Sequence, residues 1–221
     1  MIYKTDKVKI KKIQVDNGVA EFGFYEIDKS KYIEKEVGEL PKGAKFVYGR
    51  KEWIKLDDRG CDSFVAQADV QEGAFCGEYE KVTYEWERSK LRDYINDWKM
   101  NETFFEIYMK DLKHFPRKLV TGCYSDGIAD DVVSILTLSE YDEYKPLLPP
   151  AIKVESEMGE EKEVPAEEFV LTASDDMNGL TVVNPDGTIN DEVLWCESLF
   201  YRRAMMMRGK TKVFIEKGEK R

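Results

Sequence analysis

YEWERSKLRDYINDW, residues 84–98, is the stretch that decides the fold, and it places two tryptophans and two tyrosines among seven charged side chains. Its four regularly spaced apolar residues are Leu91, Tyr94, Ile95 and Trp98. They recur at i, i+3, i+4 and i+7, which is the spacing of one face of an α-helix. The stretch is therefore predicted to be a helix with a buried apolar face, with Trp86 near that face, rather than an aromatic binding site.

The size and composition of the chain predict a folded domain. Its 221 residues suffice for one ordinary domain with a core. The hydrophobic content of 42% and aromatic content of 12% are typical of a packed globule. A net charge of −10 argues against a general nucleic-acid binder. No apolar run approaches the ~20 residues of a membrane helix, and the N-terminus is charged where a signal peptide is apolar. We therefore expect no membrane partner and a cytoplasmic location.

The first third of the chain reads as β-structure. Residues 7–25 alternate apolar and polar on either side of an Asp-Asn-Gly turn at 16–18, which predicts a hairpin. Two short strands are predicted around Gly49, with Trp53 in the core, and another over residues 63–70.

Two further helices are predicted in the middle of the chain. Residues 101–112 begin with a good N-cap and carry Phe104 and Phe105 on an apolar stripe. A short third helix begins with the capping box of Thr137 and Glu140, directly after a buried strand.

The last third returns to β-structure after a Pro- and Glu-rich segment, 145–168, that we expect to be a long mobile loop. Strands are predicted within 168–174, 179–189, 198–207 and 211–217. The order of strands, helices and strands predicts an α+β domain with two or three helices packed on mostly antiparallel sheets.

Residues suited to catalysis or metal binding are few. The only histidine, His114, ends a predicted helix, where a surface role is more common than catalysis. Cys61, Cys76, Cys123 and Cys196 form no CxxC pair, which favours reduced, mostly buried thiols. A Cys61–Cys76 bridge is the alternative in an oxidising compartment.

The closing third also holds oxygen-rich turns. Asp175, Asp176 and Asn178 lie in one of them, but a single short turn supplies too few oxygens for Ca²⁺. We expect no metal and no cofactor.

The segment 200–208 combines aromatic residues, arginines and methionines. Aromatic residues and arginine are enriched in interface hot spots. The alternative is a core strand with one of its two adjacent arginines facing out. The candidate ligand-binding residues are Trp195, Tyr201, Arg203, Asp175, Asp176 and Asn178.

Three stretches in order carry a family resemblance. Residues 37–56 place Gly49 shortly before Trp53, and residues 131–144 pair a central strand with a helix start that contains Ser139, Glu140 and Tyr144. The middle stretch carries the hallmark residues Trp86, Glu87, Ser89, Leu91, Arg92, Tyr94, Ile95, Asn96, Phe104 and Phe105. The chain resembles a family of bacterial and phage domains of unknown function with a C-type-lectin-like fold. That fold is shared with the formylglycine-generating enzymes and with retroelement-diversified phage receptor-binding proteins.

The resemblance implies a domain division and a set of core residues. It covers residues 37–207, with an added N-terminal hairpin over 1–36 and a basic tail or last strand over 208–221. The closing part departs from the family, because Phe200 replaces a glycine and Arg203 replaces a proline. The implied core residues are Trp53, Trp86, Leu91, Tyr94, Ile95, Trp98, Phe104 and Phe105.

The resemblance also implies that a ligand binds on the last loops and strands. Formylglycine-generating enzymes hold copper with two nearby cysteines in that segment, whereas this chain has only Cys196 there. We therefore expect a non-enzymatic module that binds an unknown protein or glycan. A phage-encoded module would be virion-associated, and a homo-oligomer is a further expectation. The alternatives are a virion structural protein with residues 1–36 as an assembly arm and, less favoured, an oxidase acting through Cys196.

Overall fold

Antiparallel strands make up most of the computed structural model, and helices are few. The residues that it describes are 6–15, 18–27, 29–49, 51–74, 89–96, 109–117, 129–150, 152–157, 160–165, 170–173, 180–183, 188–190 and 198–218. The mostly antiparallel strands and the few helices are compatible with the predicted α+β class.

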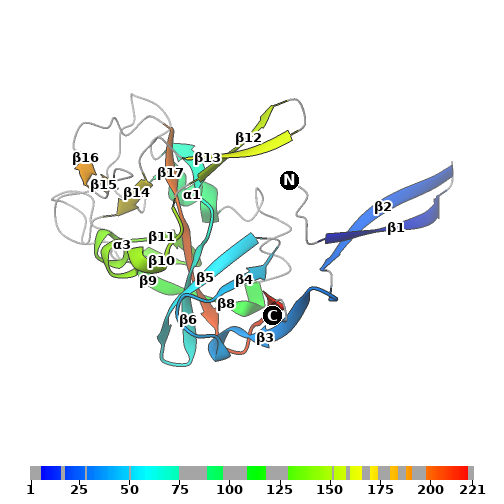
Figure 1. The fold of residues 1–221 in the computed structure, drawn as a ribbon, viewed down its shortest axis with the longest axis horizontal. Coiled ribbons are helices and arrows are strands. Elements are labelled where there is room, and N and C mark those ends of the chain that lie inside the picture. Colours follow the sequence, from blue (N-terminus) through cyan, green and yellow to red (C-terminus); the bar gives the residue numbers. More distant parts are fainter. Residues whose placement is uncertain are drawn as a thin grey trace.

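An eight-stranded sheet forms the body of the molecule (Figure 1). Its strands are β3 (Tyr32–Glu36), β4 (Lys45–Tyr48), β5 (Lys51–Arg59), β6 (Asp62–Gln67), β8 (Leu112–Lys113), β11 (Val133–Ile135), β18 (Arg203–Arg208) and β19 (Lys212–Glu216). They follow the order β11-β18-β6-β5-β4-β19-β3, and β8 pairs with β18 beside β11. Every pairing in this sheet is antiparallel.

Both faces of this sheet are apolar at its centre. Successive side chains of a strand point to opposite faces, so Met205 and Met206 enter two different core clusters. The first cluster also holds Trp53 and is covered by α1 (Lys90–Asn96) and η1 (Val37–Glu39). The second holds Phe64 and is covered by α3 (Leu138–Tyr144) and η5 (Lys145–Leu147).

A five-stranded sheet adjoins the first one through the closing strands. Its order is β16 (Ile189–Asn190), β15 (Leu180–Val183), β14 (Val170–Ala173), β17 (Ser198–Tyr201) and β7 (Gln71–Ala74). Only Arg202 separates β17 from β18, so the chain passes from one sheet to the other at this residue.

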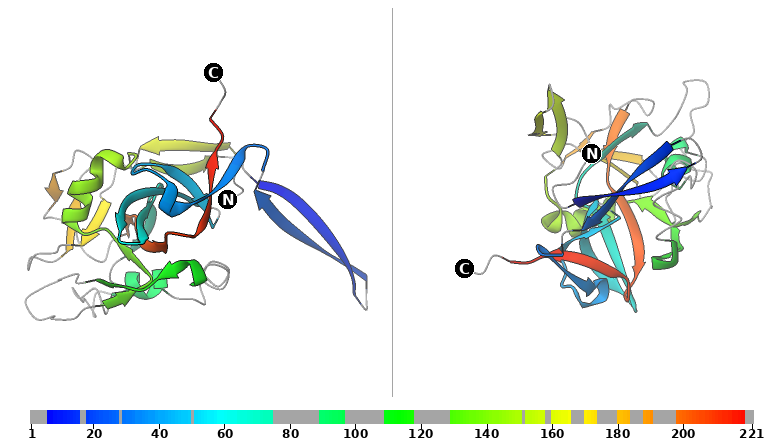
Figure 2. Two further views of the ribbon diagram at one scale, coloured as in Figure 1. Left: turned by 90° about the horizontal axis from the view of Figure 1, so that it is seen from below. Right: turned by 90° about the vertical axis from the view of Figure 1, so that its right-hand side faces the viewer.

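Three further strand pairs lie within the described residues. They are β1 (Asp6–Val15) with β2 (Gly18–Ile27), β9 (Phe115–Arg117) with β10 (Ala129–Asp131), and β12 (Ile152–Glu157) with β13 (Glu160–Pro165). The β1–β2 pair confirms the predicted first hairpin. Figures 1 and 2 show this hairpin projecting away from the body of the molecule.

The predicted loop over 145–168 is wrong. Residues 145–147 form η5, and β12 and β13 form an antiparallel hairpin. The acidic composition obscures an alternation: a single polar residue, Lys153, separates Ile152 from Val154, which suits a strand.

The predicted helix over 101–112 is present only in part of its described range. Met109–Asp111 is a 3-10 turn (η4), and Leu112 already belongs to β8. Phe104 and Phe105 lie outside the described residues.

The predicted helix at Leu91 is confirmed as α1, where Leu91 and Ile95 are buried. Tyr94 was expected in the core, but its side chain is 46% exposed because it lies at the edge of the covered helix face. Trp53 is buried as predicted, whereas Trp86 and Trp98 lie outside the described part of the chain.

The main sheet continues across both expected domain boundaries. β3 pairs along its length with β19, and Phe214 of β19 also pairs with Val47 of β4. The strand predicted within 211–217 is therefore an inner strand of the sheet. Among the helices that the structure describes, none is both long and apolar enough to cross a membrane.

Candidate functional site

The two described candidates, Tyr201 and Arg203, point inward rather than outward. Tyr201 is 0% exposed and Arg203 is 8% exposed. The other candidates, Trp195, Asp175, Asp176 and Asn178, lie outside the described residues.

The strand register explains why the Arg203 side chain is buried beside the first core cluster. Arg203 pairs with Ile135 of β11, and its neighbour Ala204 pairs with Ala66 of β6. Gln67, which follows Ala66, pairs on its other side with Trp53 of β5. Gln67 and Arg203 therefore share one row of the sheet, between two buried apolar residues of the first core cluster.

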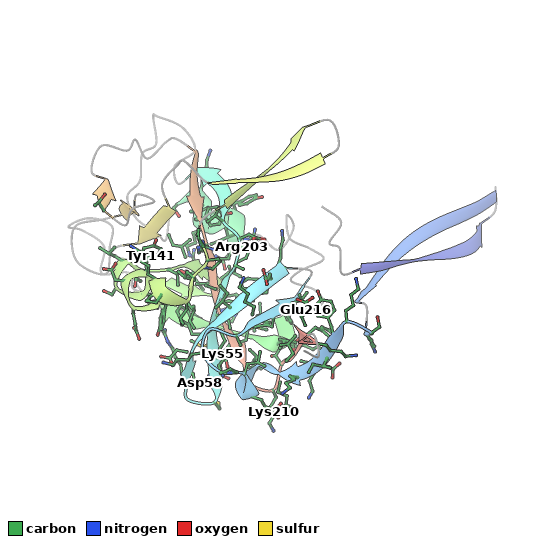
Figure 3. All side chains as sticks on the ribbon, viewed as in Figure 1. Lys55, Asp58, Tyr141, Arg203, Lys210 and Glu216 are labelled. Carbon is green, nitrogen blue, oxygen red and sulfur yellow. The ribbon has the colours of Figure 1, made fainter. Side chains whose placement is uncertain are left out.

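Tyr201 belongs to the same core cluster as Trp53 and Ile135. Gln67, Tyr201 and Arg203 are called the polar cluster below. Figure 3 shows Arg203 near the β17 end of β18, well separated from Lys55 and Asp58.

The polar cluster contains buried polar atoms without hydrogen-bond partners. Within the part of the chain that the structure describes, none is found for both amide atoms of Gln67, the Tyr201 hydroxyl and Arg203 Nε. A buried donor or acceptor left unpaired costs about 1–3 kcal/mol. Native proteins pair most such groups, so an unpaired group calls for an explanation such as a role in binding. Four unpaired atoms on three adjacent side chains therefore mark this place as a candidate ligand site.

Positive charge gathers at the polar cluster. Burial, followed by the charge of Arg203, lowers the pKa of Lys51, and Asp69 partly opposes this. Burial raises the pKa of Tyr201, while the charge of the Arg203 guanidinium and its approach to the Tyr201 hydroxyl lower it, and Tyr94 raises it. That approach does not have the geometry of a hydrogen bond, so the Tyr201 hydroxyl is left without a partner. No carboxylate among the described side chains forms an ion pair with Arg203. In an acidic protein, this arrangement of donors is suited to hold an anionic group.

The adjacent Arg202 has a different role. It is 3% exposed, and its guanidinium donates to the carbonyls of Ala68 and, at 2.6 Å, Pro149. Burial lowers the pKa of Arg202 to about 10. Arg202 therefore ties β6 to the segment after α3. The prediction that one of the two arginines faces out is wrong, because both faces of the sheet are covered here.

Among the described residues, the other reactive side chains form no comparable site. His114 is on the surface, with Nδ1 3.4 Å from Asp130 Oδ2. Cys61 is a free thiol, as expected, and it is exposed, whereas the other three cysteines lie outside the described residues. A search of the described residues finds no group of three side chains suited to hold a metal ion.

Sequence reasoning did not identify Gln67 or Lys51 as site residues. The available signal was Gln67 within the otherwise apolar run 64–68, but this signal indicates a site only once the strand pairing shows which residues lie beside Gln67. Comparison of the chain with protein-family models, curated proteins and solved structures finds no match.

Proposed function

We propose that this protein is a non-enzymatic binding module with a C-type-lectin-like fold, in which the closing strands bind the ligand. The observation that carries the proposal is the polar cluster, which contains buried polar atoms without partners on β6, β17 and β18. The family resemblance supports the same region, because it expects the ligand on the last loops and strands.

The energetic argument favours binding. Groups held in a rigid sheet are already ordered, so a ligand that pairs with them loses little further conformational entropy. The desolvation of these groups has already occurred on folding, and a ligand would offset its cost.

The test compares two arginines of the same strand. Arg208 is exposed at the other end of β18, where its Nε donates to the Lys110 carbonyl at 3.1 Å, so Arg208→Met is the matched control for Arg203→Met. Each immobilised protein is incubated with cell extract, and retained proteins and small molecules are identified by mass spectrometry.

We expect the wild type and Arg208→Met to retain the same ligand and Arg203→Met to lose it. Circular dichroism establishes that each variant is folded. Equal retention by folded Arg203→Met would refute the proposed binding region.

A second candidate function is assembly, and the projecting β1–β2 hairpin supports it. Its ten-residue strands pair with each other, and in the described structure neither joins another sheet. A two-stranded hairpin standing alone is only marginally stable in water, so pairing with another chain would stabilise it. In this alternative the protein is a virion structural protein and residues 1–36 contain the assembly arm.

Size-exclusion chromatography with light scattering tests the assembly function. The full chain is compared with a chain starting at Lys29, which lacks β1 and β2. We expect the full chain to form a larger species, and identical molar masses would exclude an assembly role for this hairpin.

A further inference from the structure

We propose that the polar cluster binds a hydroxy carboxylate, with Arg203 and Tyr201 on the ligand carboxylate and Gln67 on a neighbouring ligand hydroxyl. This inference rests on the proposed binding function and adds the chemical class of the ligand. The class includes small hydroxy acids and the acidic sugar residues of glycans.

The inventory of unpaired atoms defines this class. Arg203 Nε, the Tyr201 hydroxyl and Gln67 Nε2 supply donors, whereas Gln67 Oε1 needs a donor from the ligand. An ionised carboxylate only accepts hydrogen bonds, so by itself it leaves Oε1 unpaired. A hydroxyl beside the carboxylate can donate to Oε1 and accept from Nε2. Both functions are therefore required on one ligand.

The positive charges of Arg203 and Lys51 restrict the class of ligand further. Arg203 and Lys51 are close enough for the charge of one to lower the pKa of the other. A second cation on the ligand would be repelled, which disfavours an amino acid relative to the corresponding hydroxy acid. Sulfate offers acceptors alone and leaves Gln67 Oε1 without a donor.

Two residues connect the polar cluster to the surface. Lys51 is partly buried, and Tyr94 on α1 is 46% exposed. Lys51 interacts electrostatically with Arg203, and Tyr94 with Tyr201. Each of these two residues therefore links a buried member of the polar cluster to a side chain that reaches solvent.

The unpaired groups of the polar cluster differ from a buried polar atom of a neighbouring residue, which is paired. The neighbouring Trp53 is equally buried, yet its indole nitrogen donates to the Tyr48 carbonyl at 2.9 Å. This contrast indicates that the polar atoms of Gln67 and Tyr201 serve ligand binding rather than stability. Replacing an unpaired buried group by an apolar one of similar shape is neutral or stabilising. Tyr201→Phe and Gln67→Met should therefore keep or raise the melting temperature and lose the ligand, which a purely structural role would not produce.

Isothermal titration calorimetry tests the ligand class with defined probes. Lactate and glucuronate carry both functions, propionate only the carboxylate, glucose only hydroxyls, and sulfate only charge. Oligogalacturonate presents acidic sugar residues in a chain. The proteins are the wild type, Tyr201→Phe, Gln67→Met, Arg203→Met and the control Arg208→Met.

We expect at least one of the three hydroxy carboxylates to bind the wild type and Arg208→Met at least about tenfold more tightly than propionate, glucose or sulfate. Each polar-cluster variant should weaken that binding by about tenfold or more without a lower melting temperature. Binding of oligogalacturonate without lactate or glucuronate would identify a glycan as the source, and binding of lactate or glucuronate a free small molecule.

Three results would overturn the inference: no binding of any hydroxy carboxylate, equal binding of propionate, or unchanged binding in Tyr201→Phe and Gln67→Met. The extract experiment separates this failure from failure of the proposed function. Arg203-dependent retention of another ligand would refute the ligand class alone, whereas Arg203-independent retention would refute both.

Discussion

Gly209 lies where three backbone segments meet. Its N–H donates to the Cys61 carbonyl at 3.2 Å, and its carbonyl accepts from the Gly38 N–H at 2.9 Å. A Cβ on Gly209 would overlap the Cys61 carbonyl oxygen. We expect Gly209→Ala to lower the free energy of unfolding by about 1–3 kcal/mol, because the backbones must separate. Urea denaturation measures the difference.

The control for this prediction is Gly218→Ala. A Cβ on Gly218 would meet nothing within 4 Å, so its effect should stay within about 0.5 kcal/mol. Equal urea midpoints for Gly209→Ala and Gly218→Ala would show that the space between Gly209 and the Cys61 carbonyl can accommodate a Cβ.

Tyr144 gives the stability of the protein a pH dependence in the alkaline range. Its hydroxyl donates to Asp57 Oδ2 at 3.1 Å, and burial raises its pKa to about 12, with Asp57 adding to the effect and Arg59 opposing it. An unfolded tyrosine titrates near pH 10, so the folded chain holds a proton that the unfolded chain releases. The stability from Tyr144 is therefore complete below about pH 10 and is lost as the pH rises toward about 12.

We expect the free energy of unfolding to fall less steeply in Tyr144→Phe than in the wild type between about pH 9.5 and about pH 11. Urea denaturation at several pH values measures the slopes. Tyr94→Phe, which changes a 46% exposed side chain, is the control and should follow the wild type. If the free energy of unfolding falls equally steeply with pH in all three proteins, Tyr144 is not the source of the alkaline pH dependence.

Single residues also show where sequence reasoning stops. Lys55 is 0% exposed, and its ammonium donates to the carbonyls of Gly38 and Leu40 at 3.1 and 2.7 Å. A lysine in an alternating strand is ordinarily read as solvent-facing. These carbonyls belong to the segment around η1, well before Lys55 in the chain, so local patterns could not predict its burial.

At the scale of elements, local motifs were predicted well. The Thr137–Glu140 capping box is confirmed: Thr137 Oγ1 accepts from the Glu140 N–H at 3.1 Å, and Glu140 Oε2 accepts from the Thr137 N–H at 3.0 Å. Such a motif depends on neighbours three residues apart, and the sequence contains all of them. Glu140 also forms an ion pair with Arg59 at 2.9 Å, which ties the helix to β5.

We expect Thr137→Ala to lower the free energy of unfolding by about 0.5–2 kcal/mol, because the Glu140 N–H loses its side-chain acceptor. Asp142→Ala, at an exposed position of the same helix, is the control and should have a smaller effect. Thermal and urea denaturation measure both. If Asp142→Ala is as destabilising as Thr137→Ala, the cap is not the cause.

The elements that were missed, and the site, depend on pairings between distant segments. The charged composition of the β12–β13 hairpin predicts a loop, because it outweighs the weak alternation of apolar residues. Tyr201 and Arg203 were chosen by residue type, but their burial follows from the neighbours of β18 on both sides. Gln67 can be recognised as a site residue only when the pairing of β6 with β18 is known, because that pairing places Gln67 beside Arg203.

At the scale of the whole molecule, the strand order joins the two halves of the sequence. β19, near the C-terminus, lies between β3 and β4, which precede it by more than 160 residues. Val213 of β19 is 0% exposed in the first core cluster, and Lys212 pairs with Glu36 at 2.9 Å. The sequence predicts that β19 exists, but its place in the sheet requires the partners to be known.

This order makes the final strand a requirement for folding. A chain that ends at Gly209 lacks β19, which leaves facing edges of β3 and β4 unpaired and opens the first core cluster to water. We expect that chain to lose its cooperative thermal transition, measured by circular dichroism, and to aggregate on size-exclusion chromatography. The chain that starts at Lys29 lacks more residues but keeps the whole main sheet, so its melting temperature should match that of the full chain. A cooperative thermal transition in the chain that ends at Gly209 would show that the sheet is stable without β19.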